Sequence, residues 1–256
     1  MSGPPGPAHF NALALARSSS RRRITSRGVR VHVALTPAAA ARVPTGIVVD
    51  VLRATSTIVQ ALDGGYRRVL CCSEVDEARA LRDEVGDAVL AGERRAEPIA
   101  GFDVGNSPRD FLEPRAETLV LTTTNGTRAI VAAAADCDVV LIGSLFNLDA
   151  VARHAAERGE DVEVVCAGVE GRFALDDVYC AGRLVELLEG DRTDAAEGAV
   201  RIARSFPNAE AAFRVSENPY RRSIADDLVW CARENVTRVV PRFVSMRGPA
   251  AEIVAG

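Results

Sequence analysis

The sequence contains no lysine, so all 31 of its basic residues are arginines. Arginine forms bidentate clamps on phosphate or carboxylate, but biased codon usage gives the same composition, and both explanations stay open. Long apolar runs are also missing, and none approaches the roughly 18 residues that a membrane-spanning helix needs. With 48% apolar and 26% charged residues, the composition is typical of a soluble globular protein. It excludes membrane, fibrous and wholly disordered classes, and we expect no membrane partner.

Zinc-site spacings are missing as well. Six cysteines occur without a CxxC pair, and the chain has three histidines in all. Cys71 and Cys72 adjoin, while the other four cysteines stand singly in apolar segments. We therefore expect reduced, packed thiols and a cytoplasmic location.

Acidic residues are missing from residues 1–27, which hold five arginines among glycine, proline and serine. Since this stretch has no hydrophobic periodicity, we expect a disordered basic extension; a transit peptide or a start codon placed too far upstream would give the same pattern. The rest of the chain holds 26 of the 31 basic residues against 35 acidic ones. Such an acidic body is not expected to bind nucleic acid.

The length of 256 residues corresponds to between one and two domains at about 150 residues each. No repeat or long linker divides the chain, so we expect one α/β domain over residues 28–246 and a frayed tail over residues 247–256. From Val29 onward, short runs of Val, Leu and Ile alternate with helix-length segments. This alternation predicts a layered α/β fold, a mixed sheet with a mostly parallel centre and helices on both faces.

Strands are expected near residues 29–35, 46–51, 67–71, 88–91, 118–123, 139–142 and 162–166. Helices are expected near residues 55–62, 75–85, 127–135, 148–158, 177–189 and 224–235. Because residues 46–51, 118–123 and 162–166 are nearly continuous apolar runs, these three strands should be buried on both faces in the middle of the sheet. After residue 190 the pattern is helical but less diagnostic, and an alanine-rich stretch near residues 193–212 is a candidate homodimer interface.

Each of these three strands ends in a polar cluster, and ligands of open α/β sheets bind outside the carboxyl ends of the strands. In the first cluster, Asp50 closes a strand and Arg53 follows it. The hydroxyls of Thr55, Ser56 and Thr57 then open a helix whose N-terminus favours an anion. A helix cap explains one hydroxyl, but it does not explain Asp50 and Arg53, and a buried carboxylate must be hydrogen-bonded or bound to a metal.

The second cluster is Thr124-Asn125-Gly126-Thr127-Arg128. Its Asn-Gly pair suits a tight turn whose backbone N–H groups can surround phosphate oxygens. An Asn-Gly turn with a threonine cap also needs no ligand, so both interpretations stay open.

The third cluster follows Cys166. Glu170, Asp176 and Asp177 offer hard oxygen donors, and Arg172 offers a fork for phosphate. The spacing of Cys166 and Arg172 also fits the C-x5-R loop of cysteine phosphatases, although a buried cysteine at a strand end gives the same pattern.

The polar stretch over residues 92–114 is predicted to cross this site as a long loop, because structureless loops of that length are usually functional. Within it, Glu93 and Asp103 would add carboxylates to Asp50 and Glu170. An ordinary surface loop is the alternative. Together the four carboxylates could hold magnesium with water and substrate oxygens.

Five sequence blocks occur together: VDVLRATST at 49–57, GER at 92–94, GFDVGNSP at 101–108, TTTNGT at 122–127 and CAGVEGRF at 166–173. In this order they resemble the 2-phosphosulfolactate phosphatase family. The resemblance implies a layered α/β fold particular to the family and a magnesium-dependent phosphatase acting on phosphate esters of 2-hydroxy carboxylic acids, known from coenzyme M biosynthesis. The chain departs from the family pattern at Arg95 and Ala96, where glycines are expected, and its last quarter matches loosely.

We therefore predict that Mg²⁺ is held by some of the carboxylates Asp50, Glu93, Asp103 and Glu170. Arg53 and Arg172, with N–H groups of residues 54–57 and 125–127, would hold the phosphoryl oxygens. A water activated by the metal or by a carboxylate would attack phosphorus in line. Arg128 would bind the carboxylate or sulfonate of a small anionic 2-hydroxy acid ester.

Three other mechanisms or roles compete with this hypothesis. A haloacid-dehalogenase phosphatase needs a second Asp two residues after Asp50, where this chain has Leu52, so that route is disfavoured. A cysteine phosphatase would use Cys166 with Arg172 and would survive chelation. A non-catalytic protein could bind a phosphorylated metabolite with the same groups, but its surplus carboxylates would repel the anion unless a cation intervened.

Overall fold

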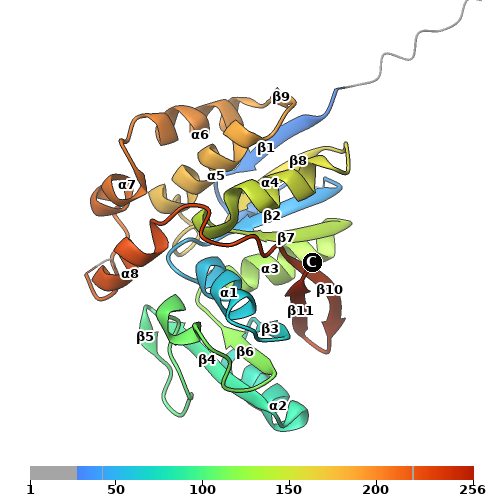
Figure 1. Ribbon diagram of the computed structural model, residues 1–256, viewed down its shortest axis with the longest axis vertical. Helices are drawn as coiled ribbons and strands as arrows, with labels where there is room; N and C mark the ends of the chain where they lie inside the picture. Colours follow the sequence, from blue (N-terminus) through green and yellow to red (C-terminus); the bar gives the residue numbers. More distant parts are fainter. Residues whose placement is uncertain (1–27, 42, 221) are drawn as a thin grey trace, which may run out of the picture.

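The computed structural model describes residues 28–41, 43–220 and 222–256 (Figure 1), and the expected basic extension over residues 1–27 lies outside this part. The strands are β1 (Arg30–Ala34), β2 (Thr45–Val49), β3 (Arg68–Cys72), β4 (Ala88–Arg94), β5 (Glu97–Pro98), β6 (Thr118–Thr122), β7 (Val139–Gly143), β8 (Val162–Cys166), β9 (Asp191–Arg192), β10 (Pro241–Arg247) and β11 (Ala250–Ala255). The helices are α1 (Ala54–Asp63), α2 (Val75–Val85), α3 (Gly126–Asp136), α4 (Leu148–Ala156), α5 (Leu175–Leu187), α6 (Asp194–Arg204), α7 (Ala209–Val215) and α8 (Ala225–Cys231), with short 3₁₀ helices η1 (Pro37–Ala39), η2 (Pro108–Phe111) and η3 (Leu145–Asn147).

The strands form one mixed sheet in the order β5-β4-β6-β3-β11-β10-β7-β2-β8-β1-β9. Two parallel groups, β4-β6-β3 and β7-β2-β8-β1, stand on either side of the antiparallel hairpin β10–β11. The predicted α/β class with a layered mixed sheet is confirmed. The predicted position of the three apolar strands in the middle of the sheet is wrong, because the hairpin β10–β11 occupies the middle and β6 and β8 each stand third from an edge. All three strands are nevertheless buried along their whole length.

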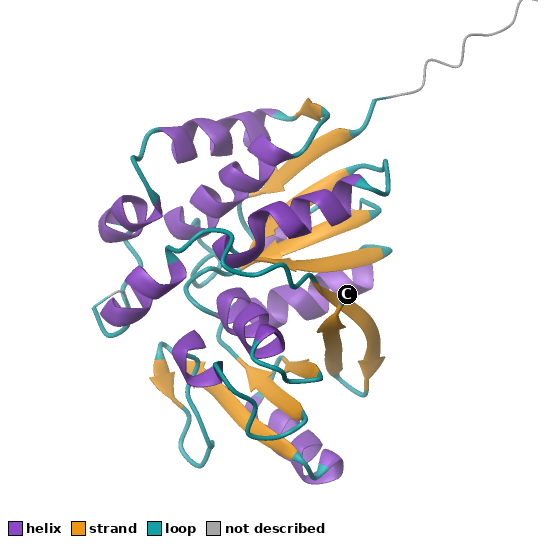
Figure 2. Ribbon diagram, viewed as in Figure 1, coloured by secondary structure: helices purple, strands orange, loops and turns teal. Residues whose placement is uncertain are grey.

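The strand β2 is covered on both faces. Ile47 and Val49 pack into the core that α4, α5 and α6 share, while Val48 packs into the core of α1 and α3. Because successive side chains of a strand point to opposite faces, this alternation accounts for the continuous apolar run in the sequence. Figure 2 shows the helices packed around the parallel strands of the group β7-β2-β8-β1. No helix in the part of the chain described here is long and apolar enough to cross a membrane.

The end of the chain is a strand, which corrects the expected fraying of residues 247–256. Residues Ala250–Ala255 form β11, which pairs antiparallel with both β10 and β3. Ala250, Ala251 and Ile253 are buried. Gly248 supplies the left-handed backbone of the turn, with a φ of 58°. A short alanine-rich strand has a weak sequence signal because its burial depends on partners far away in the chain.

Several alanines of the stretch near residues 193–212, which the sequence suggested as a candidate homodimer interface, face the interior of the molecule. Ala196, Ala199 and Ala203 of α6 are buried. At Gly182 of α5, an added Cβ would lie 2.2 Å from the Ala199 carbonyl oxygen and 2.8 Å from the Ala203 Cβ. The small residues therefore let α5 and α6 approach each other closely inside the molecule.

Candidate active site

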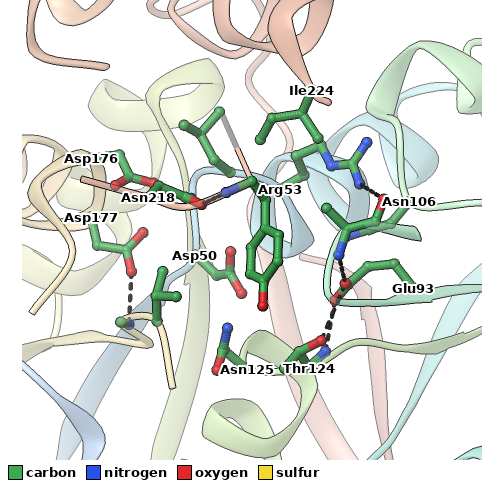
Figure 3. A pocket seen from close by; sticks show the side chains of 15 residues that line it. Asp50, Arg53, Glu93, Asn106, Thr124, Asn125, Asp176, Asp177, Asn218 and Ile224 are labelled. Atoms are coloured by element: carbon green, nitrogen blue, oxygen red, sulfur yellow. Dashed lines mark hydrogen bonds between the residues drawn. The ribbon is translucent and has the colours of Figure 1, made fainter. Parts of the chain in front are cut away.

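A pocket lies at the carboxyl ends of β2, β4, β6 and β8. The empty space in it is about 480 Å³ when the space open to solvent at its mouth is included. Its lining side chains come from the turns that lead into α1 and α3, from the start of α5, from the turn after β4 and from the segment before α8 (Figure 3). The ends of both parallel strand groups thus meet at one hollow, which is where open α/β sheets place their ligands.

Asp50, directly after β2, is the centre of this pocket. Its side chain is buried, and Oδ1 accepts a long hydrogen bond of 3.4 Å from the Ala54 N–H at the start of α1. Burial, followed by the negative charges of Glu93 and Asp176, raises the pKa of Asp50 to about 7, although the Ala54 N–H and the charge of Arg53 oppose this shift. The site therefore holds a carboxyl group whose charged form is poorly compensated by the protein.

Two further carboxylates come from the first turn of α5. Asp177 accepts the N–H groups of Val51 and Gly168, each at 2.9 Å, and thereby ties the ends of β2 and β8 together. Asp176 accepts the Ser216 hydroxyl at 3.2 Å. Burial raises the pKa of Asp176 to about 6, and burial followed by the charge of Asp176 raises the pKa of Asp177 well above its usual value. Like charges are thus collected on one side of the pocket.

Glu93, the sixth residue of β4, faces the pocket with a different environment. One oxygen accepts the Thr124 N–H at 2.7 Å, and the other accepts the Ala96 N–H at 2.6 Å and the Thr124 hydroxyl at 3.2 Å. These bonds hold the turn after β4 against the turn before α3. Glu93 therefore shapes the pocket as well as adding charge to it.

A cation reaches the pocket from the β2–α1 turn. The Arg53 Nη1 donates to Asp227 Oδ2 at 2.7 Å, and its Nη2 lies 3.5 Å from the Ala96 carbonyl oxygen. Arg53 has a 10% exposed side chain and lines the pocket. The guanidinium therefore stands beside the buried carboxylates with its position fixed from behind.

The turn before α3 approaches Asp50 at a glycine. A Cβ at Gly126 would lie 2.4 Å from Asp50 Oδ2 and 2.4 Å from the Ala54 Cβ. Only glycine leaves room for the first turns of α1 and α3 to meet beside the carboxylate. The Asn-Gly pair of the sequence is thus explained by a close approach in space, and Asn125 itself lines the pocket.

Comparison with known proteins identifies the family. A family model described as 2-phosphosulpholactate phosphatase matches residues 32–245 of this chain. The chain belongs to the 2-phosphosulfolactate phosphatase family. The predicted family is therefore confirmed.

Three members of the 2-phosphosulfolactate phosphatase family show the extent of the similarity. The chain is 39% identical over 200 residues to the 2-phosphosulfolactate phosphatase of Methanothermobacter thermautotrophicus. The aligned region covers 77% of this chain and 85% of that protein. It is 36% identical over 213 residues to a probable 2-phosphosulfolactate phosphatase of Clostridium acetobutylicum (78% and 90%) and 37% identical over 220 residues to one of Deinococcus radiodurans (82% and 90%).

The hydroxyls predicted to bind substrate donate hydrogen bonds to backbone carbonyls of the protein. Thr55 donates to the Asp50 carbonyl at 3.0 Å, Ser56 to the Val51 carbonyl at 2.9 Å and Thr57 to the Asn106 carbonyl at 3.0 Å. The Thr127 hydroxyl likewise donates to the Thr123 carbonyl at 3.2 Å. The Thr55, Ser56 and Thr127 hydroxyls thus shape local turns, and Thr57 ties α1 to the segment before η2, because each hydroxyl gives its single proton to a backbone oxygen.

Two of the predicted metal ligands do not line the pocket. Asp103 accepts the Leu90 N–H at 2.8 Å and lies 3.7 Å from Arg82, so its carboxylate serves the loop after β4. Glu170 is exposed and accepts the Tyr220 hydroxyl at 3.0 Å. Within residues 28–41, 43–220 and 222–256, no three Asp, Glu, His or Cys side chains are close enough together to hold a metal. The predicted four-carboxylate set is therefore not assembled.

Both of the outer arginines lie away from the pocket. Arg172 has a 73% exposed side chain, lies 3.7 Å from Glu170 and lines a neighbouring hollow. Arg128 pairs with Glu74 at 2.8 Å on the surface. Neither side chain lines the pocket, so this arrangement does not form the predicted contacts with phosphate and carboxylate.

Cys166 is buried in the core formed with α5 and does not line the pocket. Burial, and to a lesser degree the charge of Asp177, raise the pKa of this thiol well above its usual value. A nucleophilic cysteine needs the opposite shift. The geometry therefore disagrees with the C-x5-R interpretation, since Cys166 and Arg172 do not face a common space.

Several pocket residues were missed by sequence reasoning. Asn106, Asn218, Tyr220 and Ile224 line the pocket, and Asp227 stands behind Arg53. The segment before α8 carries no strand-end signal, so nothing in the sequence pattern linked it to the site. Asp176 was visible as an oxygen donor, and its place in the first turn of a helix that follows a buried strand is the signal that could have selected it.

Proposed function

We propose that this protein is a Mg²⁺-dependent phosphatase that hydrolyses phosphate esters of 2-hydroxy carboxylic acids, with 2-phosphosulfolactate as substrate and sulfolactate and phosphate as products. The names of its relatives support the substrate. The pocket supports the chemistry, because it combines carboxylates, an arginine and the N-termini of α1, α3 and α5. Helix N-termini and guanidinium groups favour phosphate oxygens.

One observation carries the proposal: Asp50 lies among other buried carboxylates, its pKa is raised to about 7, and Arg53 lines the same pocket. A phosphate ester is itself an anion, so it would be repelled by Asp50, Asp176 and Glu93 if nothing else entered the site. A divalent cation removes this conflict because it attracts both the carboxylates and the phosphate. The excess of negative charge is thus the reason to propose a metal.

The donor set of the pocket fits magnesium. Mg²⁺ prefers oxygen ligands and is usually bound through one or two carboxylates, with water and substrate phosphate completing the shell. Asp50 and Asp176 would hold it, because Glu93 and Asp177 already accept two or more hydrogen bonds each. When bound, the ion would neutralise charge that develops on the phosphoryl group.

The protein's own groups perform the remaining tasks. Arg53 would hold equatorial phosphoryl oxygens, which gain charge in the transition state. A pocket carboxylate would accept a proton from the water that attacks phosphorus in line, and the P–O bond to the 2-hydroxy acid would break on the opposite side. Asn125 and Asn218 line the pocket and can hydrogen-bond to the acid part of the substrate.

We also propose a cytoplasmic location and a function without nucleic acid. All six cysteines lie in the described part of the chain as free thiols, which is the usual state in the reducing cytoplasm. The net charge of −4 at pH 7 gives no electrostatic attraction to nucleic acid. A homodimer remains a prediction without a candidate surface, and sedimentation of the purified protein would test it.

Phosphate release separates hydrolysis from binding alone. The purified protein is incubated with phosphosulfolactate and, separately, with phospholactate, each with Mg²⁺ and with EDTA. The proposal expects phosphate only with the metal. Absence of phosphate under every metal condition would favour a non-catalytic protein that binds phosphorylated metabolites.

A further inference from the structure

The carboxylate of Asp227 in α8 is buried and accepts hydrogen bonds from two segments, the turn between β2 and α1 and the residues at the start of η2. Its Oδ2 accepts Arg53 Nη1 at 2.7 Å, and its Oδ1 accepts the Ser107 hydroxyl at 2.7 Å and Arg109 Nε at 3.0 Å. The side chain of Asp227 is 3% exposed. Asp227 does not itself line the pocket, so it contacts the site through Arg53.

The guanidinium of Arg53 is held at two points. One is Asp227, and the other is the Ala96 carbonyl oxygen, whose own residue donates its N–H to Glu93. These contacts use two of the five N–H donors that a guanidinium carries. Because the group is planar and rigid, fixing two corners fixes the direction of the other donors. Arg53 is thereby aimed while it lines the pocket.

The two oxygens of Asp227 have different partners. Oδ1 accepts hydrogen bonds from Ser107, which precedes η2, and from Arg109 within η2, whereas Oδ2 accepts one from Arg53. If Asp227 only attached α8 to η2, its contacts with Ser107 and Arg109 would be enough, and the contact with Arg53 would not be needed. The charge pair with Arg53 is also the more buried of the two arginine contacts, since the Arg109 side chain is 42% exposed and that of Arg53 is 10% exposed.

We propose that Asp227 is a positioning residue that orients the Arg53 guanidinium toward the phosphoryl group of the substrate. The inference rests on the proposed phosphatase function. Its chemical basis is that an oriented donor stabilises transition-state charge far better than a mobile one. The helix α8 thus completes the site although no strand leads into it.

Four variants test the proposal: Asp227→Asn, Arg109→Ala, Arg53→Ala and the double variant Arg53→Ala with Asp227→Asn. Asp227→Asn keeps the shape of the side chain but loses the charge that holds Arg53. We expect kcat/KM to fall about 10- to 100-fold, because a misplaced guanidinium costs both phosphate binding and transition-state stabilisation. Arg109→Ala, which breaks the Oδ1 contact, should stay within about threefold of the wild type.

The double variant decides whether Asp227 acts through Arg53. If it does, Asp227→Asn costs nothing further once Arg53 is gone, and the double variant matches Arg53→Ala within about twofold in kcat/KM. A further tenfold loss would overturn the proposal, and so would an Arg109→Ala variant as impaired as Asp227→Asn. Thermal melts accompany each assay and show whether each variant is folded.

A binding measurement keeps the test valid without turnover. Calorimetry with inorganic phosphate and Mg²⁺ should show binding weakened about fivefold or more in Asp227→Asn and little changed in Arg109→Ala. Equal affinity in wild type and Asp227→Asn would overturn the positioning role, as would failure of the folded wild type to bind phosphate at all. If the wild type binds phosphate but releases none from any ester, the phosphatase function is refuted. The phosphate affinities of wild type and Asp227→Asn then test the positioning of Arg53 on their own.

Discussion

Two helices of this protein begin with an adjacent pair of aspartates, and the two pairs have opposite electrostatic environments. Asp176 and Asp177 open α5, and Asp226 and Asp227 open α8. Acidic residues in a first turn stabilise a helix in either case. In α8 one member is exposed and the other is paired with Arg53, whereas in α5 both members are buried and neither forms an ion pair with a residue that the structure describes.

The two pairs show the difference between a carboxylate that stabilises the structure and carboxylates whose charge a ligand compensates. A buried carboxylate with an arginine partner is compensated, so Asp227 can serve as a fixed point. The buried carboxylates Asp50 and Asp176 repel each other, and burial together with this repulsion raises the pKa of Asp50. Such uncompensated groups destabilise a fold and are retained where a ligand compensates them. The comparison predicts that removing charge from the two places has opposite effects on stability.

The largest expected effect comes from Asp50→Asn. Phosphate release should fall by at least about a thousandfold, because the variant loses a proposed metal ligand at the centre of the pocket. The metal-free variant should melt at the same temperature as the wild type or higher at pH 7.5, since it carries one buried charge fewer. Phosphate assays and thermal melts on the same preparations measure both effects.

Asp226→Asn is the matched control for Asp50→Asn. Its carboxylate is 79% exposed and contacts Arg109 at 3.4 Å. An exposed pair contributes about 0–1 kcal/mol, so activity should stay within about twofold. Retained turnover in Asp50→Asn, or an equal loss in both variants, would remove Asp50 from the mechanism.

The next largest effect is expected from Gly126→Ala. The added methyl group would lie 2.4 Å from Asp50 Oδ2 and from the Ala54 Cβ, so the carboxylate or the helix must move. We expect activity to fall about a hundredfold, in line with the effect of a displacement of about 1 Å at a catalytic group. Gly198→Ala on α6 is the control, because a Cβ there meets nothing within 4 Å. The control should keep full activity and gain up to about 1 kcal/mol of stability.

The pH dependence of stability should be visible in the metal-free protein. Burial raises the pKa of Asp50 from 3.8 to about 7 and that of Asp176 from 3.8 to about 6, so the folded state binds protons more tightly than the unfolded state. Between about pH 4 and pH 7, the free energy of unfolding should therefore fall by several kcal/mol as pH rises. Urea unfolding at pH 5 and pH 7.5, compared between wild type and Asp50→Asn, isolates this contribution.

Magnesium should replace the protons in that experiment. Added Mg²⁺ should raise the melting temperature of the wild type more at pH 7.5 than at pH 5, because the carboxylates are charged at the higher pH. The shift should be much smaller in Asp50→Asn. Identical shifts at both pH values would mean that the ion binds elsewhere.

The strand ends were predictable from the sequence because their signals are local. Asp50 follows a continuous apolar strand, and the Asn125-Gly126 turn has the residues that a tight approach requires. The first expected helix, residues 55–62, differs from α1 by one residue at each end. Short-range patterns of this kind depend on the chain's own periodicity, so a single sequence contains them.

The parts that sequence missed depend on distant partners. The sequence suggests that Thr55 binds substrate, but in the structure its hydroxyl donates a hydrogen bond to the Asp50 carbonyl. Arg172 reads as a phosphate clamp, but direction cannot be deduced from spacing, and its side chain points to solvent. The segment around Tyr220 and the strand β11 reach their places through tertiary contacts alone, which no local pattern encodes.

The smallest expected effect concerns Cys166→Ser, and it separates metal-dependent hydrolysis from a cysteine mechanism. The thiol is fully buried with a raised pKa and does not line the pocket, so the reaction does not need it. Turnover should stay within about threefold of the wild type, with a modest loss of stability because a hydroxyl replaces the thiol in an apolar core. The same preparations should lose activity in EDTA. A variant without turnover beside a wild type that survives chelation would instead place the nucleophile at Cys166, because a thiolate attacks phosphorus without a metal.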